Sequence, residues 1–139
     1  MKRVFKNIVV SVTLAVAVTS LVILLGSCDG ETTHKFIIKN DGGICKIVDE
    51  SDNLDITVHP GDWVVWENQY GSDVELIFPP ATTRLFGVQK ATSYSSGDQL
   101  KLQIREDADT GSTFKYDTNC GTTLPGPGII VCPPGQPSC

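Results

Sequence analysis

The side chains that bind transition metals or transfer protons are scarce in this sequence. Its 139 residues include two histidines, His34 and His59, and a single methionine, Met1. Five cysteines are present, but no two are spaced as Cys-x-x-Cys, the arrangement of thioredoxin-like redox sites and of many zinc knuckles. No serine or cysteine lies in the context of a recognisable catalytic nucleophile. We therefore expect a protein that is not an enzyme and that carries no cofactor.

Basic residues are also few, and they are not clustered. Eleven Lys and Arg stand against 16 Asp and Glu, which gives a formal net charge of −5. Three of the eleven are Lys2, Arg3 and Lys6, so the chain beyond them carries about −8. Binding to nucleic acid depends on clustered Lys and Arg that displace counterions from phosphates. The composition therefore argues against a nucleic-acid partner.

The N-terminus has the pattern of a bacterial lipoprotein signal peptide. After the basic start, Ile8–Leu25 is uncharged and mainly apolar, and Leu25-Gly26-Ser27-Cys28 resembles the lipobox, whose cysteine receives a diacylglycerol thioether. We expect a signal peptide over 1–27, lipidation of Cys28 and a short tether over 28–33. The alternative is an uncleaved anchor helix, because 18 such residues can just span a bilayer. Either arrangement attaches the chain to the extracytoplasmic face of a bacterial membrane, periplasmic or at the cell surface.

The rest of the sequence has the pattern of short strands separated by turn residues. Apolar and polar residues alternate in short runs that end at Gly, Pro, Asn or Asp. A further strand is possible at 84–88, and no segment has a convincing helical period. Eight or nine strands predict an all-β fold, an antiparallel Greek-key β-sandwich, in one domain over residues 34–131.

Residues 54–78 are the most informative part of this pattern. Pro60-Gly61-Asp62 predicts a hairpin-like reversal, because proline fixes φ and glycine turns freely. In the following strand Val64 and Trp66 share one face, and the opposite face is apolar as well. We therefore expect this strand to be central in its sheet, with Val64 and Trp66 in the core.

Two motifs in the chain resemble those of a known family. Gly61-Asp62-x-Val64-x-Trp66-x-Asn68 resembles the GDxVxWxN signature of cupredoxins, the small copper-binding β-sandwich proteins. Gly111-x-x-Phe114-x-Tyr116 is similar to the GxYxY run that precedes their last copper-ligand loop. The resemblance extends over residues 34–131 and implies a cupredoxin-like sandwich.

The resemblance also implies where copper ligands would lie, and most of them are missing. Cupredoxins place one His after the first motif, and a Cys, a His and often a Met after the second. Residues 68–76 (NQYGSDVEL) contain no His, and residues 118–128 (TNCGTTLPGPG) contain Cys120 without His or Met. A blue-copper site needs two imidazoles and a thiolate. We therefore predict a binding or assembly module with an unidentified protein partner and no metal; the alternative is an atypical copper-binding or electron-transfer protein that uses Cys120 with non-standard ligands.

Besides Cys28, the cysteines are an even number, and in an exported chain this predicts two disulfides. They are Cys45, Cys120, Cys132 and Cys139. In a cupredoxin-like sandwich the turn before Ile44 and the loop after Tyr116 lie at the same end, so the resemblance implies Cys45–Cys120. Cys132–Cys139 would then close a Pro-rich tail over 132–139. The alternative pairing is Cys120–Cys132 with Cys45–Cys139.

Overall fold

A computed structural model describes residues 31–95, 97–120 and 126–139. The predicted signal peptide and Cys28 lie outside these residues. Within them the chain forms ten strands and one short helix. In chain order these are β1 (Thr33–Asp41), β2 (Ile44–Asp49), β3 (Asp55–Val58), β4 (Trp63–Asn68), β5 (Val74–Ile77), α2 (Pro80–Phe86), β6 (Lys90–Ser93), β7 (Gln99–Gln103), β8 (Ser112–Lys115), β9 (Asp117–Thr118) and β10 (Gly128–Val131). No helix in the described part of the chain is both long enough and apolar enough to cross a membrane.

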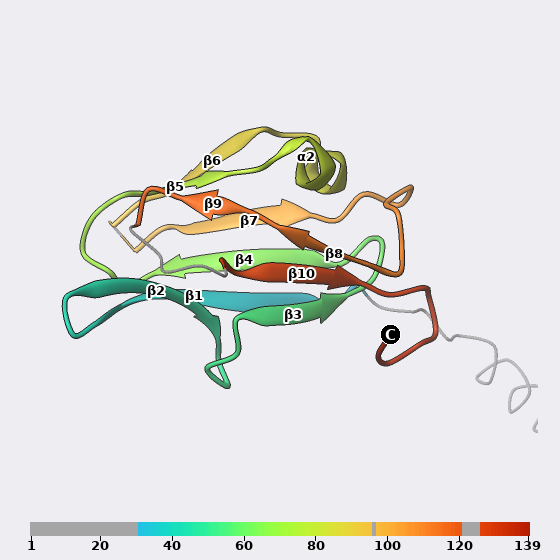
Figure 1. The fold of residues 1–139 in the computed structure, drawn as a ribbon, viewed down its shortest axis with the longest axis horizontal. Helices are drawn as coiled ribbons and strands as arrows, with labels where there is room; N and C mark the ends of the chain where they lie inside the picture. Colours follow the sequence, from blue (N-terminus) through green and yellow to red (C-terminus); the bar gives the residue numbers. More distant parts are fainter. Residues whose placement is uncertain (1–30, 96, 121–125) are drawn as a thin grey trace, which may run out of the picture. The chain divides into compact units, whose positions relative to one another are not determined.

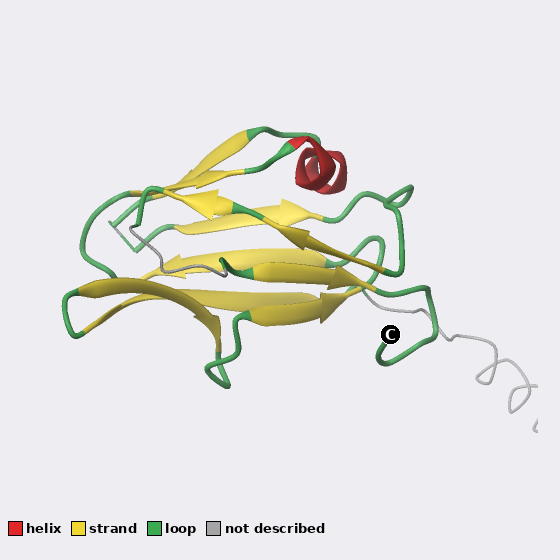
Figure 2. Cartoon of the chain, viewed as in Figure 1, coloured by secondary structure: helices red, strands yellow, loops and turns green. Residues whose placement is uncertain are grey.

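The strands form the layers of a β-sandwich (Figures 1 and 2). One sheet has the order β2-β1-β4-β7. Two smaller sheets, β3-β10-β8 and β6-β5-β9, are linked because β8 and β9 follow each other with only Tyr116 between them. The predicted all-β sandwich is confirmed. Five of the described pairings are antiparallel, and two, β1 with β4 and β10 with β3, are parallel.

The prediction of a possible strand at 84–88 is wrong, because helix α2 occupies most of this region (Figure 2). Pro80 lies in the first turn, where a missing N–H costs nothing, and the main-chain N–H of Thr83 donates to Pro79 O at 2.8 Å. Gly87 ends the helix in the left-handed conformation, with φ of +73°. The Pro-Pro pair therefore starts a helix as well as ending the preceding strand.

The turn predicted at Pro60-Gly61-Asp62 is present, but the prediction that the strands on its two sides pair as a hairpin is wrong. Strand β3 pairs with β10, whereas β4 pairs with β1 and β7 in the other sheet. The turn therefore carries the chain from one sheet to the other. Turn residues specify a change of direction, but they do not specify which strands hydrogen-bond after it.

Strand β4 is central in its sheet, as predicted, and its inward face builds the core. Val64 and Trp66 are both 0% exposed. The indole Nε1 of Trp66 donates a hydrogen bond of 2.8 Å to the Tyr116 hydroxyl, which joins the two layers inside the core. Burial raises the pKa of Tyr116, so this hydroxyl stays neutral. Phenylalanine rings surround the pair with centroids 5.7 to 6.3 Å from the indole; they are Phe36, Phe78 and Phe86.

The Asp62 carboxylate organises the crossing between the sheets. One oxygen, Oδ1, accepts from the main-chain N–H of Thr32 at 3.0 Å. The other, Oδ2, accepts from the main-chain N–H of His59 and from His34 Nε2, each at 2.8 Å. The main chain of Asp62 also accepts from Ile104 N–H at 2.8 Å, after the end of β7. Asp62 thus joins the turn to the start of β1 and to the end of β7.

The neighbouring Gly61 allows this turn. Its φ of +88° lies in the left-handed region, and a Cβ there would lie 2.9 Å from Oε1 of Glu106. Its N–H donates to Ile104 O at 3.0 Å. The Gly-Asp part of the motif is therefore explained by the backbone and packing of the crossing.

We expect Trp66→Ala to lower the free energy of unfolding by about 3 to 5 kcal/mol, because it leaves a cavity and removes the hydrogen-bond partner of Tyr116. Guanidinium denaturation would measure this. Trp63→Ala is the matched control, since Trp63 lies half-buried on the opposite face, where it contacts Glu31 and Lys101. That control should lose only about 1 kcal/mol. Equal losses in the two variants would contradict the assignment of Trp66 to the core.

The ionisation of Asp62 should make the free energy of unfolding depend on pH in the acid range. Burial raises the pKa of Asp62, but the hydrogen bonds from His59, His34 and Thr32 outweigh burial and hold it below its usual range. Its stabilising contribution is therefore complete above the unfolded-state pKa of about 3.9 and is lost as the pH falls through the lower folded value.

Asp62→Asn should lose about 1 to 3 kcal/mol at neutral pH, because an amide cannot accept from all of these donors. Its unfolding free energy should also fall less steeply with acid than that of the wild type, as measured by denaturation between pH 7 and 3. Asp107→Asn is the control, since Asp107 makes an exposed ion pair with Arg105. A wild-type acid response in Asp62→Asn would show that Asp62 is not the group responsible.

Candidate functional site

The structure joins the four described cysteines in the favoured pairing. Cys45 is bonded to Cys120 with their Cα atoms 5.3 Å apart, and Cys132 is bonded to Cys139 with a Cα separation of 5.6 Å. The predicted Cys45–Cys120 and Cys132–Cys139 disulfides are thus confirmed. The first links the start of β2 in one sheet to the segment after β9 in the other layer.

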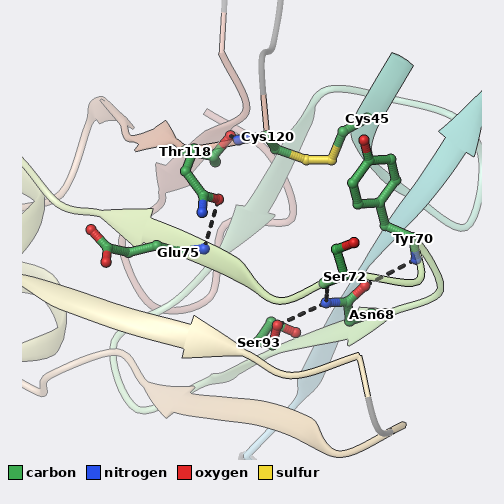
Figure 3. Close-up of a disulfide and its surroundings, with 9 residues drawn as sticks. Cys45, Asn68, Tyr70, Ser72, Glu75, Ser93, Thr118 and Cys120 are labelled. Carbon is green, nitrogen blue, oxygen red and sulfur yellow. Dashed lines mark hydrogen bonds between the residues drawn. A yellow bond between two sulfur atoms is a disulfide. The ribbon is translucent and has the colours of Figure 1, made fainter. Parts of the chain in front are cut away.

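A solvent-open hollow of about 430 Å³ lies beside the Cys45–Cys120 disulfide. Figure 3 shows the Tyr70 side chain on the Cys45 side of this bond. The residues around the hollow come from the β1–β2 turn and the start of β2, from the β4–β5 loop and the start of β5, and from the segment after β9. They are Gly43, Ile44, Cys45, Tyr70, Ser72, Asp73, Val74, Asn119 and Cys120.

Asn68 does not line the hollow itself but bonds to two residues of the β4–β5 loop that do, Tyr70 and Ser72. Its side-chain Nδ2 donates to the main-chain oxygens of Ser72 at 2.8 Å and Ser93 at 2.7 Å, and its Oδ1 accepts from Tyr70 N–H at 2.9 Å (Figure 3). The Asn68 side chain is buried, and both its carbonyl oxygen and its NH2 group have hydrogen-bond partners, as buried polar groups usually do. The last residue of the GDxVxWxN motif therefore holds the β4–β5 loop in place.

Asn119 holds the segment before Cys120 in place, as Asn68 holds the β4–β5 loop. Its Oδ1 accepts from the main-chain N–H of Glu75 at 2.8 Å, and its own main-chain N–H donates to Glu75 O at 3.2 Å. These bonds extend the pairing of β9 with β5 as far as the residue before Cys120. The sequence did not identify either asparagine as a residue that orders this region. The place of Asn68 in the GDxVxWxN motif could have indicated its role, whereas no sequence feature indicates the role of Asn119.

The described residues that line the hollow are partly apolar and include no basic side chain. Ile44 is 55% exposed at its rim, Val74 is buried at its base, and Tyr70 packs partly against the core. The one carboxylate in the lining, Asp73, accepts from Ser95 N–H at 2.9 Å. A lining of this kind can bind another surface through apolar contact and hydrogen bonds.

The donor atoms at this end do not fit a blue-copper site. The sulfur of Cys120 is bonded to Cys45, and a thiolate is the ligand that such a site requires. Neither imidazole is near, because His34 and His59 both lie at the opposite end of the sandwich beside Asp62. In the described part of the chain no group of three or more His, Cys, Asp or Glu side chains is arranged so that it could hold a metal ion. Cys120 lies where the resemblance implies a copper thiolate, but the implied His and Met ligands are not present beside it in the sequence.

The two disulfides should differ in their effect on stability. Cys45–Cys120 closes a separation of 75 residues and Cys132–Cys139 one of 7, so the chain-entropy model assigns them about 4 and about 2 kcal/mol. We expect Cys45→Ala/Cys120→Ala to lose about twice as much unfolding free energy as Cys132→Ala/Cys139→Ala in urea. Thiol counting of the denatured, unreduced wild type should find no free thiol at these four positions. A free Cys120 would contradict the pairing.

Comparisons with known proteins find similarity to solved structures. No protein-family model matches the chain, and no curated protein matches it. Among solved structures, a purple cupredoxin from Nitrosopumilus maritimus is 14% identical, with a TM-score of 0.48, and the match covers 70% of this chain and 98% of that one. A reduced and an oxidised amicyanin variant are 13% and 15% identical, with TM-scores of 0.43 and 0.44, each covering 76% of this chain and 86% of its own.

Proposed function

We propose that this protein is a lipid-anchored extracytoplasmic binding module, built on a cupredoxin-like sandwich that does not hold blue copper. The observation that carries the proposal is the Cys45–Cys120 disulfide beside the hollow. A bonded cysteine pair stands at the end of the domain where the family resemblance expects a copper thiolate.

The hollow is the proposed contact surface for a protein partner. It combines an exposed aliphatic side chain, Ile44, with the half-buried ring of Tyr70 and with main-chain groups held in place by Asn68. Interface cores favour aromatic and aliphatic side chains surrounded by polar groups. The disulfide and the two asparagine side chains keep this surface in one conformation, which lowers the entropy cost of binding.

The proposed location follows from the N-terminal sequence. A lipidated Cys28 would attach the domain to the extracytoplasmic face of a bacterial membrane, with stable anchoring by more than one acyl chain. Disulfides persist in that oxidising environment. The negative charge of the chain and the absence of a basic group in the hollow make a protein a better partner than a nucleic acid.

The proposal can be tested by recovering cross-linked partners from native membranes with the full chain. We expect Ile44→Asp to reduce recovery of a specific partner by about tenfold, which corresponds to about 1.4 kcal/mol. Leu54→Asp is the matched control, because Leu54 is also exposed, at 38%, and does not line the hollow. This control should recover the partner as the wild type does. Cys28→Ala should move the protein from the membrane fraction to the soluble fraction.

Two results would overturn this proposal. One is equal recovery with both aspartate variants, which would place binding away from the hollow. The other is stoichiometric copper with an intense visible charge-transfer band after the full chain is incubated with copper, which would support the copper-binding alternative.

A further inference from the structure

The chain enters the sandwich at the Asp62 end, opposite the hollow, and is held in place there from Glu31 onward. The main-chain N–H of Thr32 donates to Asp62 Oδ1 at 3.0 Å, and Thr32 O accepts from the main-chain N–H of Trp63 at 2.8 Å. The Glu31 carboxylate accepts from the indole Nε1 of Trp63 at 2.8 Å and from Gln103 Nε2 at 3.3 Å. Glu31 and Thr32 therefore have fixed positions at this end of the domain.

The tether between the expected lipidation site and this entry point is short. Only Asp29 and Gly30 separate Cys28 from Glu31 in the sequence. A fully extended chain spans at most about 3.6 Å per residue, so the Cα atoms of Cys28 and Glu31 can be at most about 11 Å apart. Lipidation of Cys28 would hold that residue at the bilayer surface. Glu31 would then lie within about 11 Å of the surface.

The hollow lies much farther from the entry point than the tether can reach. Strand β1 leads away from Glu31 over nine residues, Thr33–Asp41, and at about 3.3 Å per residue it covers about 26 Å. The turn that follows contributes Gly43, and the start of β2 contributes Ile44, to the lining of the hollow. Figure 1 shows this turn and the C-terminal tail at opposite ends of the sandwich.

The outward face of β1 and β2 does not offer a surface that would bind the bilayer sideways. The lysines that these strands present there are paired with carboxylates: Lys35 with Glu67 at 2.6 Å, Lys39 with Asp52 at 2.7 Å and Lys46 with Asp52 at 3.2 Å. The chain beyond the signal peptide also has an excess of acidic residues. Attraction to anionic lipids requires basic groups in excess, so the tether decides how the domain is oriented.

We propose that the Asp62 end of the sandwich faces the lipid bilayer and that the hollow faces the aqueous phase. The bilayer-facing surface comprises 31–33, the β3–β4 turn and the C-terminal tail, in which Gln136 O lies 2.7 Å from His59 Nε2. The proposal rests on the proposed lipidation of Cys28 and deepens the proposed function. A protein partner would reach the hollow from the aqueous side and not from within the same bilayer.

The two tryptophans of the chain allow a direct test. The processed lipoprotein would be placed in phosphatidylcholine vesicles that contain a lipid with a nitroxide on its headgroup, a short-range quencher of indole fluorescence. We expect the nitroxide to remove roughly half of the Trp63 emission, because the tether keeps Glu31 and the adjoining indole near the headgroups. Trp63→Phe retains only Trp66, which is 0% exposed in the core, and should lose little emission.

Two further variants test the orientation and its cause. Ile44→Trp in the Trp63→Phe background places the exposed reporter at the rim of the hollow, and its emission should not be quenched. An insertion of about 20 Gly and Ser residues after Gly30 gives a flexible tether with a mean span of about 25 Å. In this variant the quenching of Trp63 should fall about twofold or more, because the domain can leave the surface.

Three results in vesicle-bound, lipidated protein would overturn the orientation while leaving the proposed anchoring intact. They are emission of Trp63 that is not quenched, quenching of Ile44→Trp as strong as that of Trp63, and quenching of Trp63 that the longer tether does not change. Intact mass and flotation of the vesicles test the anchor separately. A Cys28 without a diacylglycerol group would refute the proposed anchoring and the orientation with it.

Discussion

The arrangement of the two layers depends on the hydrogen bonds that the buried carboxylate of Asp62 accepts. It accepts hydrogen bonds from Thr32 at the start of β1, from His59 at the end of β3 and from the His34 ring. A buried charge is stable only when donors surround it, so these segments must meet at one point. The turn at Gly61 then directs β4 into the centre of its sheet, where Trp66 reaches Tyr116 across the core.

The two ends of the sandwich are stabilised by different physical means. At the Asp62 end, charge and hydrogen bonding hold the turn, the first strand and the tail together. At the other end the Cys45–Cys120 bond joins the layers covalently, and Asn68 and Asn119 order the loops beside it. Because the disulfide uses both sulfurs, neither is available as the thiolate that a blue-copper site requires.

Much of the fold could be predicted because local pattern and burial coincide. The alternation around Val64 and Trp66 identified a central strand, and the turn residues separated most strands correctly. The errors have specific causes. Pro79 and Pro80 end β5 and also provide the first turn of α2, and a pattern of breakers does not distinguish these two roles. The turn at Asp62 has the composition of a hairpin, although its strands pair with partners far away in sequence.

The sequence by itself determined the β-rich class, the shortage of histidine and methionine for copper, and the number of cysteines available for bonding, because these depend on composition and short-range periodicity. Tertiary structure decided that Asn68 holds a loop that lines a hollow, that Asn119 lines the same hollow, and that His34 and His59 converge on Asp62. His34 and Asp62 are 28 positions apart, and Glu75 and Asn119 are 44 positions apart, so neither contact leaves a mark in the local pattern. Their proximity arises only when strands distant in the chain pair and the two layers pack around Trp66.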